Sequence, residues 1–391
     1  MAKIVIWLGP AVERWNPVTA LETGIGGSET AAIHMSRELA LLGHEVAVYA
    51  DVEPCSIDAD DDGVFPHSVD VDWLPYGKMP ARLPCDLFIS SRQPEARRQL
   101  IPHCKQAWLW VHDLHCGPDW DKLLATDYDK ILCLSSWARG KFLGYYPGVD
   151  PEKVATTRNT VDGRLFQNRT TSETVGYGKI PHRHRPGGQH LAWATGQIPF
   201  RATYSSSPDR GLSKLLELWP AIRRLATIPQ NPFNPELHVY YGFETWAKMA
   251  ELQGRHEDRI KIRLLHEKME RTPGVVYHGR AGQSEIALSH LQSQLWLYPT
   301  DFFETSCITA MEALAAGSKV VATKCGALPE TALWGHFVDG PTARVGYDER
   351  FLECAHDALS DDSCFIAEPE PWSNVALQWD SWLKEGEKSH G

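Results

Sequence analysis

Two glutamates, Glu304 and Glu312, stand eight positions apart in the stretch 298–317, where an apolar run gives way to a loop and then to an alanine-rich helix. Thr305 or Ser306 is expected to cap that helix, which should end before the glycine that closes the stretch. The free N–H groups at its start and the positive end of its dipole suit an anion such as a diphosphate. A buried Glu312 carboxylate would need hydrogen-bond donors, which ribose hydroxyls supply. The alternative is a surface Glu304 and a Glu312 paired with a lysine or arginine.

Two loops elsewhere in the chain have residue types that suit ligands. Gly24-Ile-Gly-Gly-Ser-Glu29 precedes an expected helix, and its glycines would let the backbone approach a ligand closely. The loop from Gly9 to Gly27 is too long for the tight turn of a dinucleotide-binding site. In the second loop, Tyr204–Gly211, Arg210 comes directly before a helix. Arg210 is therefore a candidate ligand for phosphate, or else a surface arginine at a helix start.

His112 follows an expected strand at its carboxyl end, where α/β proteins collect ligands. A structural histidine is the alternative. A metal cluster of His112 with Asp113, His115 and Cys116 is a further alternative, although this spacing matches no ligand pattern that we can justify.

In their collinear order these motifs resemble the retaining GT-B glycosyltransferases grouped as family 4, which have a Glu-x7-Glu signature. The resemblance implies two Rossmann-like domains facing across a cleft, a UDP- or GDP-sugar as donor, and no obligatory cofactor or metal. It implies that Glu312 holds the donor ribose, and that Glu304, Arg210 and His112 form the catalytic group. The donor-binding residues that it implies are Gly26, Gly27, Ser206, Arg210, Glu304, Thr305, Ser306, Cys307 and Glu312.

One position departs from that family. Its members usually have two basic residues in the loop that contains Arg210, and Ser205 stands where the second is expected. The hydroxyls of 205–207 or Arg201 are the candidate substitutes. Two weaker matches are Asn159–Phe166, which resembles the segment closing the first domain, and Gly326–Glu330, which resembles the final loop under the donor.

Strand and helix patterns alternate along the 391 residues, as in parallel α/β domains. The expected strands are 3–8, 45–50, 86–90, 107–111, 130–134, 202–206, 236–241, 274–278, 294–298 and 319–323, and the expected helices are 28–42, 211–225, 284–292 and 306–316. We expect residues 1–168 to form an acceptor-side domain and residues 169–372 a donor domain, with a basic insertion at about 169–199. A helix at about 373–391 is expected to pack back onto the first domain.

The composition narrows the possible partners. A net charge of −11 argues against a general nucleic-acid binder. The stretch 158–201 is the exception, since it has seven Lys or Arg against two acidic residues, which leaves DNA as a candidate partner. Nine scattered cysteines, the lack of a signal peptide and the lack of a transmembrane segment predict a cytoplasmic protein.

Together these patterns predict a retaining glycosyltransferase that uses a saccharide, a lipid-linked sugar or a small molecule as acceptor. No residue pair is typical of a nucleophile and its base, so we expect the front-face attack by which the related enzymes are explained. The alternatives are transfer to a modified base in DNA, a nucleotide-sugar epimerase, and a non-catalytic nucleotide-sugar-binding module.

Overall fold

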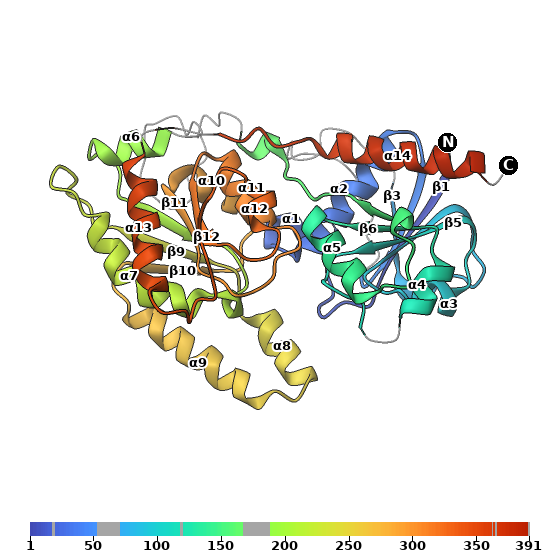
Figure 1. The fold of residues 1–391 in the computed structure, drawn as a ribbon, viewed down its shortest axis with the longest axis horizontal. Coiled ribbons are helices and arrows are strands. Elements are labelled where there is room, and N and C mark those ends of the chain that lie inside the picture. Colours follow the sequence, from blue (N-terminus) through green and yellow to red (C-terminus); the bar gives the residue numbers. More distant parts are fainter. Residues whose placement is uncertain are drawn as a thin grey trace. The chain divides into compact units, whose positions relative to one another are not determined.

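The computed structural model describes residues 1–17, 20–52, 71–117, 120–166, 188–361, 363 and 366–389. The chain divides into two compact units, called here unit 1 (Met1–Thr160 with Glu370–Gly391) and unit 2 (Val161–Pro369). Each unit has a parallel β-sheet flanked by helices (Figure 1).

The sheet of unit 1 has seven described strands in the order β3-β2-β1-β4-β5-β6-β7, all parallel. Its central strands are apolar on both faces, as parallel sheets between helices require, and Ile4, Val5 and Ile6 are all fully buried. The strands are β1 (Lys3–Gly9), β2 (Glu45–Ala50), β3 (Val71–Pro75), β4 (Pro84–Ser91), β5 (His103–Val111), β6 (Lys130–Cys133) and β7 (Val154–Thr156).

The last helix of the chain, α14, packs on unit 1 beside α2 (Figure 1). Trp372 stacks on His34 with ring centroids 5.3 Å apart, and the Trp379 indole donates to the Thr157 hydroxyl at 2.8 Å. The helices of unit 1 are α1 (Ala20–Thr23), α2 (Gly27–Leu41), α3 (Ala96–Leu100), α4 (Asp121–Asp127), α5 (Ser136–Tyr145) and α14 (Trp372–Ser389), with short 3₁₀ turns η1 (Tyr76–Lys78) and η2 (Pro151–Lys153).

Unit 2 repeats this connection pattern in the order β10-β9-β8-β11-β12-β13. Its strands are β8 (Arg201–Tyr204), β9 (Glu236–Tyr240), β10 (Val275–Gly279), β11 (Leu295–Tyr298), β12 (Lys319–Thr323) and β13 (His336–Val338). Its helices are α6 (Gly188–Ala194), α7 (Leu212–Leu225), α8 (Glu244–Leu252), α9 (His256–Arg271), α10 (Gln283–Gln292), α11 (Ile308–Ala315), α12 (Leu328–Thr331) and α13 (Tyr347–Ser360), with turns η3 (Gly163–Phe166) and η4 (Pro208–Arg210). In both units the first strand lies inside the sheet, as in Rossmann-like folds.

All the strands predicted from the sequence form, and their ends differ from the predicted ones by at most four residues. The edge strands β3, β7 and β13 were not predicted, because short edge strands have little apolar periodicity. Within the predicted insertion 169–199, the segment from Gly188 forms α6, while Lys179, Arg183 and Arg185 lie outside the described residues.

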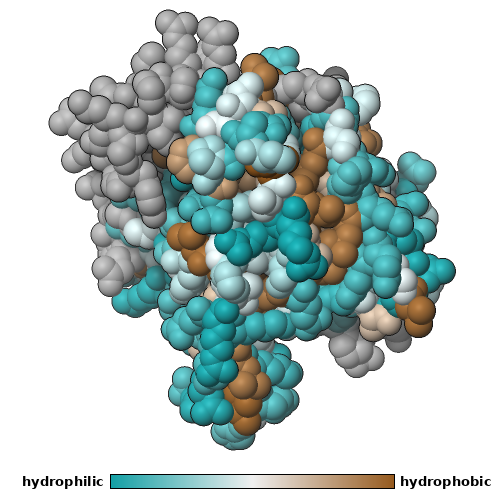
Figure 2. All heavy atoms as spheres, turned by 90° about the vertical axis from the view of Figure 1, so that its left-hand side faces the viewer, coloured by the Kyte–Doolittle hydropathy of each residue, from teal (hydrophilic) through white to brown (hydrophobic). Residues whose placement is uncertain are grey.

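The surface seen in Figure 2 is mostly hydrophilic, with hydrophobic side chains gathered in several separate areas. Within the described ranges, no helix combines the length and apolarity needed to cross a bilayer.

Candidate functional site

The candidate site of unit 2 lies where its strand order reverses. β8 pairs with β9 on one side and with β11 on the other, so the chain leaves β8 and β11 in different directions. Ligands of open α/β sheets bind beyond the carboxyl ends of strands at such a switch point. Here the β8 end leads to Arg210 and the β11 end leads to Glu304.

Glu304 is buried beside Arg210 and Tyr298. Its carboxylate Oε1 accepts a hydrogen bond from the Tyr298 hydroxyl at 2.6 Å and lies 3.4 Å from Arg210 Nη1. Ser206 Oγ in turn donates to the Tyr298 hydroxyl at 3.0 Å. The loop after β8 and the end of β11 with its following loop are far apart in sequence, and together they bring a cation, a carboxylate and two hydroxyls into contact.

The charges of Glu304 and Arg210 affect each other's pKa. Burial raises the pKa of Glu304, although Arg210 and Tyr298 act in the opposite direction. Burial is the largest single influence on Arg210 and lowers its pKa, but Glu304, Tyr298 and Asp209 together outweigh burial and hold the pKa of Arg210 above its usual range. Arg210 therefore remains a cation in this partly buried place.

The backbone around Arg210 and Glu304 is tightly packed at two glycines. Gly211 has φ +123°, and a Cβ there would lie 2.2 Å from the Pro299 carbonyl oxygen. Gly326 has φ +63°, and a Cβ there would lie 2.4 Å from the Glu304 carbonyl oxygen. The next residue, Ala327, donates its N–H to that same carbonyl at 2.7 Å. Only glycine fits these positions without strain, so the loops that hold Arg210 and Glu304 are locked to their neighbours.

Phe302 completes the surroundings of Arg210. The guanidinium carbon of Arg210 lies 3.8 Å from the centroid of the Phe302 ring, which is within cation–π range. Phe302 and Tyr298 were not predicted to belong to the site, because nothing in their local spacing indicates contact with residues of the loop after β8.

Glu312 is a buried carboxylate without a partner. It lies on α11 with an exposed fraction of 5%, and among the described residues its carboxylate makes no hydrogen bond or ion pair. Burial raises the pKa of Glu312 to about 8. An isolated buried carboxyl is costly, so this residue calls for a ligand that donates hydrogen bonds.

The predicted helix cap was wrong. α11 begins at Ile308, and its N-cap is Cys307, whose side chain makes no capping hydrogen bond. Thr305 and Ser306 lie in the preceding loop, which contacts the loop after β12 at Glu304. The Ser306 hydroxyl oxygen is buried with no partner among the described residues.

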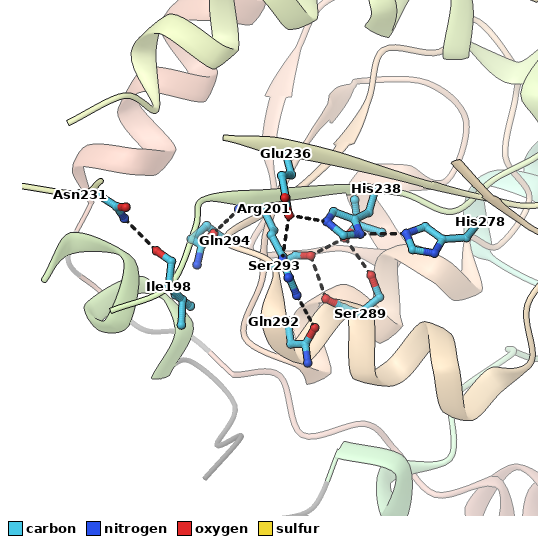
Figure 3. Close-up of polar contacts among 11 residues, drawn as sticks. Ile198, Arg201, Asn231, Glu236, His238, His278, Ser289, Gln292, Ser293 and Gln294 are labelled. Atoms are coloured by element: carbon cyan, nitrogen blue, oxygen red, sulfur yellow. Dashed lines mark hydrogen bonds and ion pairs between the residues drawn. The ribbon is translucent and has the colours of Figure 1, made fainter. Parts of the chain in front are cut away.

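Two of the candidate replacements for the second basic residue, Arg201 and Ser205, do not lie with Arg210, whereas the Ser206 hydroxyl belongs to the same group through Tyr298. Arg201 is at the opposite end of β8, where it contacts Glu236 at 3.3 Å and Gln292 at 2.5 Å (Figure 3). Ser205 faces inward, where its Oγ accepts a hydrogen bond from the Trp296 indole at 3.1 Å. Because the Ser205 side chain points into the core, its hydroxyl bonds to Trp296 and does not face the site.

In unit 1 the candidate residues also follow strand ends or begin a helix. Gly26 is the N-cap of α2, and Gly27 is its first residue. His112 follows β5 with its ring centroid 4.5 Å from that of Trp110. Burial, aided by nearby Arg92, lowers the pKa of His112 to about 3, so this imidazole is neutral at pH 7.

Arg92 is a residue of unit 1 that the sequence analysis missed. It follows β4 in the left-handed region, with φ +68°, which is unusual for a residue other than glycine. Its Nε lies 2.9 Å from Asp113 Oδ2, and its Nη1 lies 3.3 Å from the Ser28 hydroxyl at the start of α2. Asp113 is therefore ion-paired, and no group of three metal-ligating side chains occurs within the described ranges.

Comparison with known proteins gives matches in structure only. The sequence matches no protein-family model and no curated protein. Sucrose-phosphate synthase from Thermosynechococcus elongatus aligns over 99% of this chain and 100% of its own, with 13% identity and a TM-score of 0.58. HepE from Anabaena in complex with UDP-glucose aligns over 98% and 100%, with 13% identity and a TM-score of 0.56. WaaG, a glycosyltransferase involved in lipopolysaccharide biosynthesis, aligns over 99% of this chain and 98% of its own, with 15% identity and a TM-score of 0.53.

The chain has the GT-B fold. The predicted fold class is thereby confirmed, since two parallel sheets with Rossmann-like strand order match these proteins over almost their whole length. At such low identity the likeness concerns the fold, and function has to be argued from the site.

Proposed function

We propose that this GT-B chain is a retaining glycosyltransferase that moves a sugar from a nucleoside diphosphate sugar to an acceptor hydroxyl. The observation that carries the proposal is the buried, unpartnered Glu312, on the helix that follows the Arg210–Glu304 pair. Ribose hydroxyls would donate to the Glu312 carboxylate, and Arg210 would face the diphosphate. The solved structure of HepE with UDP-glucose shows that one protein of this fold takes such a donor.

The other donor contacts follow from the same placement. The N–H groups at the start of α11, near Thr305, Ser306 and Cys307, would add positive potential for the phosphates. Ser206 contributes through Tyr298, and Glu304 lies beside the donor sugar. In unit 1, Gly26, Gly27 and His112 are proposed to face the donor sugar and the acceptor.

The proposed chemistry is a front-face displacement. The bond between the anomeric carbon and the diphosphate oxygen breaks, and the acceptor oxygen bonds to that carbon on the same face. The acceptor proton passes to the leaving phosphate oxygen. The protein would act by positioning the reactants and by stabilising the developing phosphate charge with Arg210.

Binding of a nucleotide tests the role of Glu312 directly. We expect UDP or GDP, with the matching nucleotide sugar, to raise the melting temperature, since a ligand at 100 times its dissociation constant adds ~2.7 kcal/mol of stability. Glu312→Gln should weaken this binding, whereas Glu353→Gln, at an exposed position of α13, should not. Wild-type affinity in Glu312→Gln would contradict the ribose assignment.

Calorimetry in two buffers of different ionisation enthalpy provides a second readout. Because burial raises the pKa of Glu312 to about 8, its carboxyl is mostly protonated at pH 7. Donation by ribose hydroxyls favours the ionised form, so nucleotide binding should release up to about one proton. The release should disappear in Glu312→Gln.

Product analysis separates the proposal from its competitors. Transfer to a saccharide, a lipid-linked sugar or a small molecule, with the anomeric configuration kept, supports it. Conversion of the donor without an acceptor would indicate an epimerase, and binding without turnover a non-catalytic module. Transfer to duplex DNA containing hydroxymethylated bases would change the acceptor class.

A further inference from the structure

Tyr298 is a tyrosine at the end of an otherwise apolar buried strand. It is fully buried, and its hydroxyl lies between Ser206 Oγ at 3.0 Å and Glu304 Oε1 at 2.6 Å. Burial raises the pKa of Tyr298 well above its usual value, so the phenol keeps its proton. Its single proton points to Glu304, while its oxygen accepts the proton of Ser206.

The two carboxylate oxygens of Glu304 have different surroundings. Oε1 accepts from Tyr298 and lies 3.4 Å from Arg210 Nη1. Oε2 accepts no hydrogen bond from any described residue. The Glu304 side chain is only 8% exposed, and within it Oε1 has two contacts whereas Oε2 has none with a described residue.

The last torsion of a glutamate is soft, so a carboxylate group can turn unless its oxygens are held. The Arg210 contact is long at 3.4 Å and comes from a flexible side chain. The short bond from Tyr298 comes from a rigid ring packed in the sheet, with Tyr204 at a centroid distance of 5.9 Å and Trp296 at 5.0 Å. Tyr298 is thus the contact that determines the carboxylate orientation.

We propose that Tyr298, backed by Ser206, is a positioning residue for Glu304. It holds Oε1 and leaves Oε2 as the acceptor for a hydroxyl group of the bound ligand. The ligand part of this inference rests on the proposed function, in which that hydroxyl belongs to the donor sugar. The positioning part concerns the free protein and is testable without any ligand.

Other groups near Glu304 have to be held constant in such a test. The titratable groups that face its carboxylate or share its field are Arg210 and Asp209 of η4, Tyr204 of β8, Tyr298 of β11, Cys307 at the start of α11 and Cys325 in the loop after β12. The variants below change none of these except Tyr298.

The first experiment measures the pKa of Glu304 by ¹³C NMR of protein with labelled glutamate carboxyls, with Glu304→Gln to assign the signal. Removing the Tyr298 hydroxyl in Tyr298→Phe should raise that pKa by about one to two units, because a hydrogen bond to the ionised form is lost. Ser206→Ala should shift it in the same direction by less. Tyr347→Phe is the matched control, because the buried Tyr347 hydroxyl bonds to Thr323 and does not contact Glu304.

An equal pKa of Glu304 in the wild type and Tyr298→Phe, with both proteins folded, would overturn the positioning role. Ser206→Ala gives an independent reading, since it leaves the Tyr298 ring in place. A shift in Tyr347→Phe as large as that in Tyr298→Phe would also overturn it.

The second experiment follows turnover of UDP-glucose and GDP-mannose against pH. Tyr298→Phe should lower kcat about tenfold, leave the affinity for the free nucleotide within twofold, and move the acid limb of the kcat profile to higher pH. The acid limb moves because a higher pKa of Glu304 leaves less carboxylate at a given pH. If the wild type turns over no nucleotide sugar, the proposed function is wrong, and the NMR titration still decides whether Tyr298 positions Glu304. If turnover occurs but kcat and its acid limb are unchanged in Tyr298→Phe, the ligand part of the inference is wrong, and the positioning part is unaffected.

Discussion

The two units order their strands in the same way but treat the charged groups at their strand ends differently. In unit 2 Glu304 has 6% of its surface exposed, and it is held by Arg210 and Tyr298. In unit 1 the side chains of Arg92 and Asp113 form a pair that is 45% and 55% exposed. One sheet order thus supports both a buried and a solvated arrangement of charges.

This difference indicates where electrostatic effects are strong. Charges in a buried place interact through a low dielectric, whereas water and salt screen an exposed pair. A buried, pre-oriented group such as Glu304 with Arg210 suits stabilisation of a charged ligand without reorganisation. The Arg92–Asp113 pair suits adjustable polar contacts at a surface. The following predictions test this contrast, from the largest expected effect to the smallest.

Glycine substitutions in the two units should differ most. Gly211→Ala should lower the free energy of unfolding by about 4 kcal/mol, because its φ of +123° and the nearby Pro299 carbonyl both exclude a Cβ. Gly43→Ala of unit 1 is the control, with φ +88° but open space around a Cβ, and should cost about 1 kcal/mol. Urea denaturation measures both. Equal losses would show that the packing around Arg210 is less tight than the contacts indicate.

Removing either the buried Glu304 or the partly buried Arg210 should nearly abolish turnover. Glu304→Ala and Arg210→Ala should each lower kcat about a hundredfold, equivalent to ~3 kcal/mol, while the fold survives. Arg98→Ala is the control, because Arg98 belongs to an ion pair with Asp127 on unit 1 and is 61% exposed. Near wild-type turnover by folded Glu304→Ala protein would remove Glu304 from the mechanism.

Glu312 should make the stability of unit 2 fall as the pH rises from 4.5 to about 8. Burial raises its pKa from 4.5 to about 8, so its stability contribution is fully present below pH 4.5 and is lost as pH rises through 8. Between these values the wild type should lose up to about 1.4 kcal/mol per pH unit relative to Glu312→Gln, measured by urea denaturation without nucleotide. Glu353→Gln should follow the wild type. Parallel curves for the wild type and Glu312→Gln would mean that Glu312 is solvated.

The smallest effect is expected at the exposed pair of unit 1. Asp113→Ala should change the free energy of unfolding by less than about 1 kcal/mol, because solvent screens its contact with Arg92. Urea denaturation at low and high salt measures this change. A loss of more than about 2 kcal/mol in the free energy of unfolding would mean that solvent does not screen the Arg92–Asp113 pair, and the contrast with unit 2 would then be wrong.

Much of the architecture could be predicted from the sequence, because it depends on local periodicity. The apolar runs of β1 and β11 predicted buried strands, and the alternation with helices predicted two parallel sheets. The roles of the motif residues remain proposals. Short edge strands such as β7 gave no comparable signal, and the cap of α11 was misassigned by two residues or less.

The sequence by itself determined most of the strands, the spacing of Glu304 and Glu312 across the start of α11, and the glycines at tight loops, since these depend on neighbours in the chain. Only the tertiary structure decided that Arg210 meets Glu304 across 94 positions, that Ser205 faces Trp296, and that Arg201 lies at the other end of β8. The physical reason is that strand pairing and helix packing choose which polar groups share a buried space. Neighbours in the chain do not determine that choice.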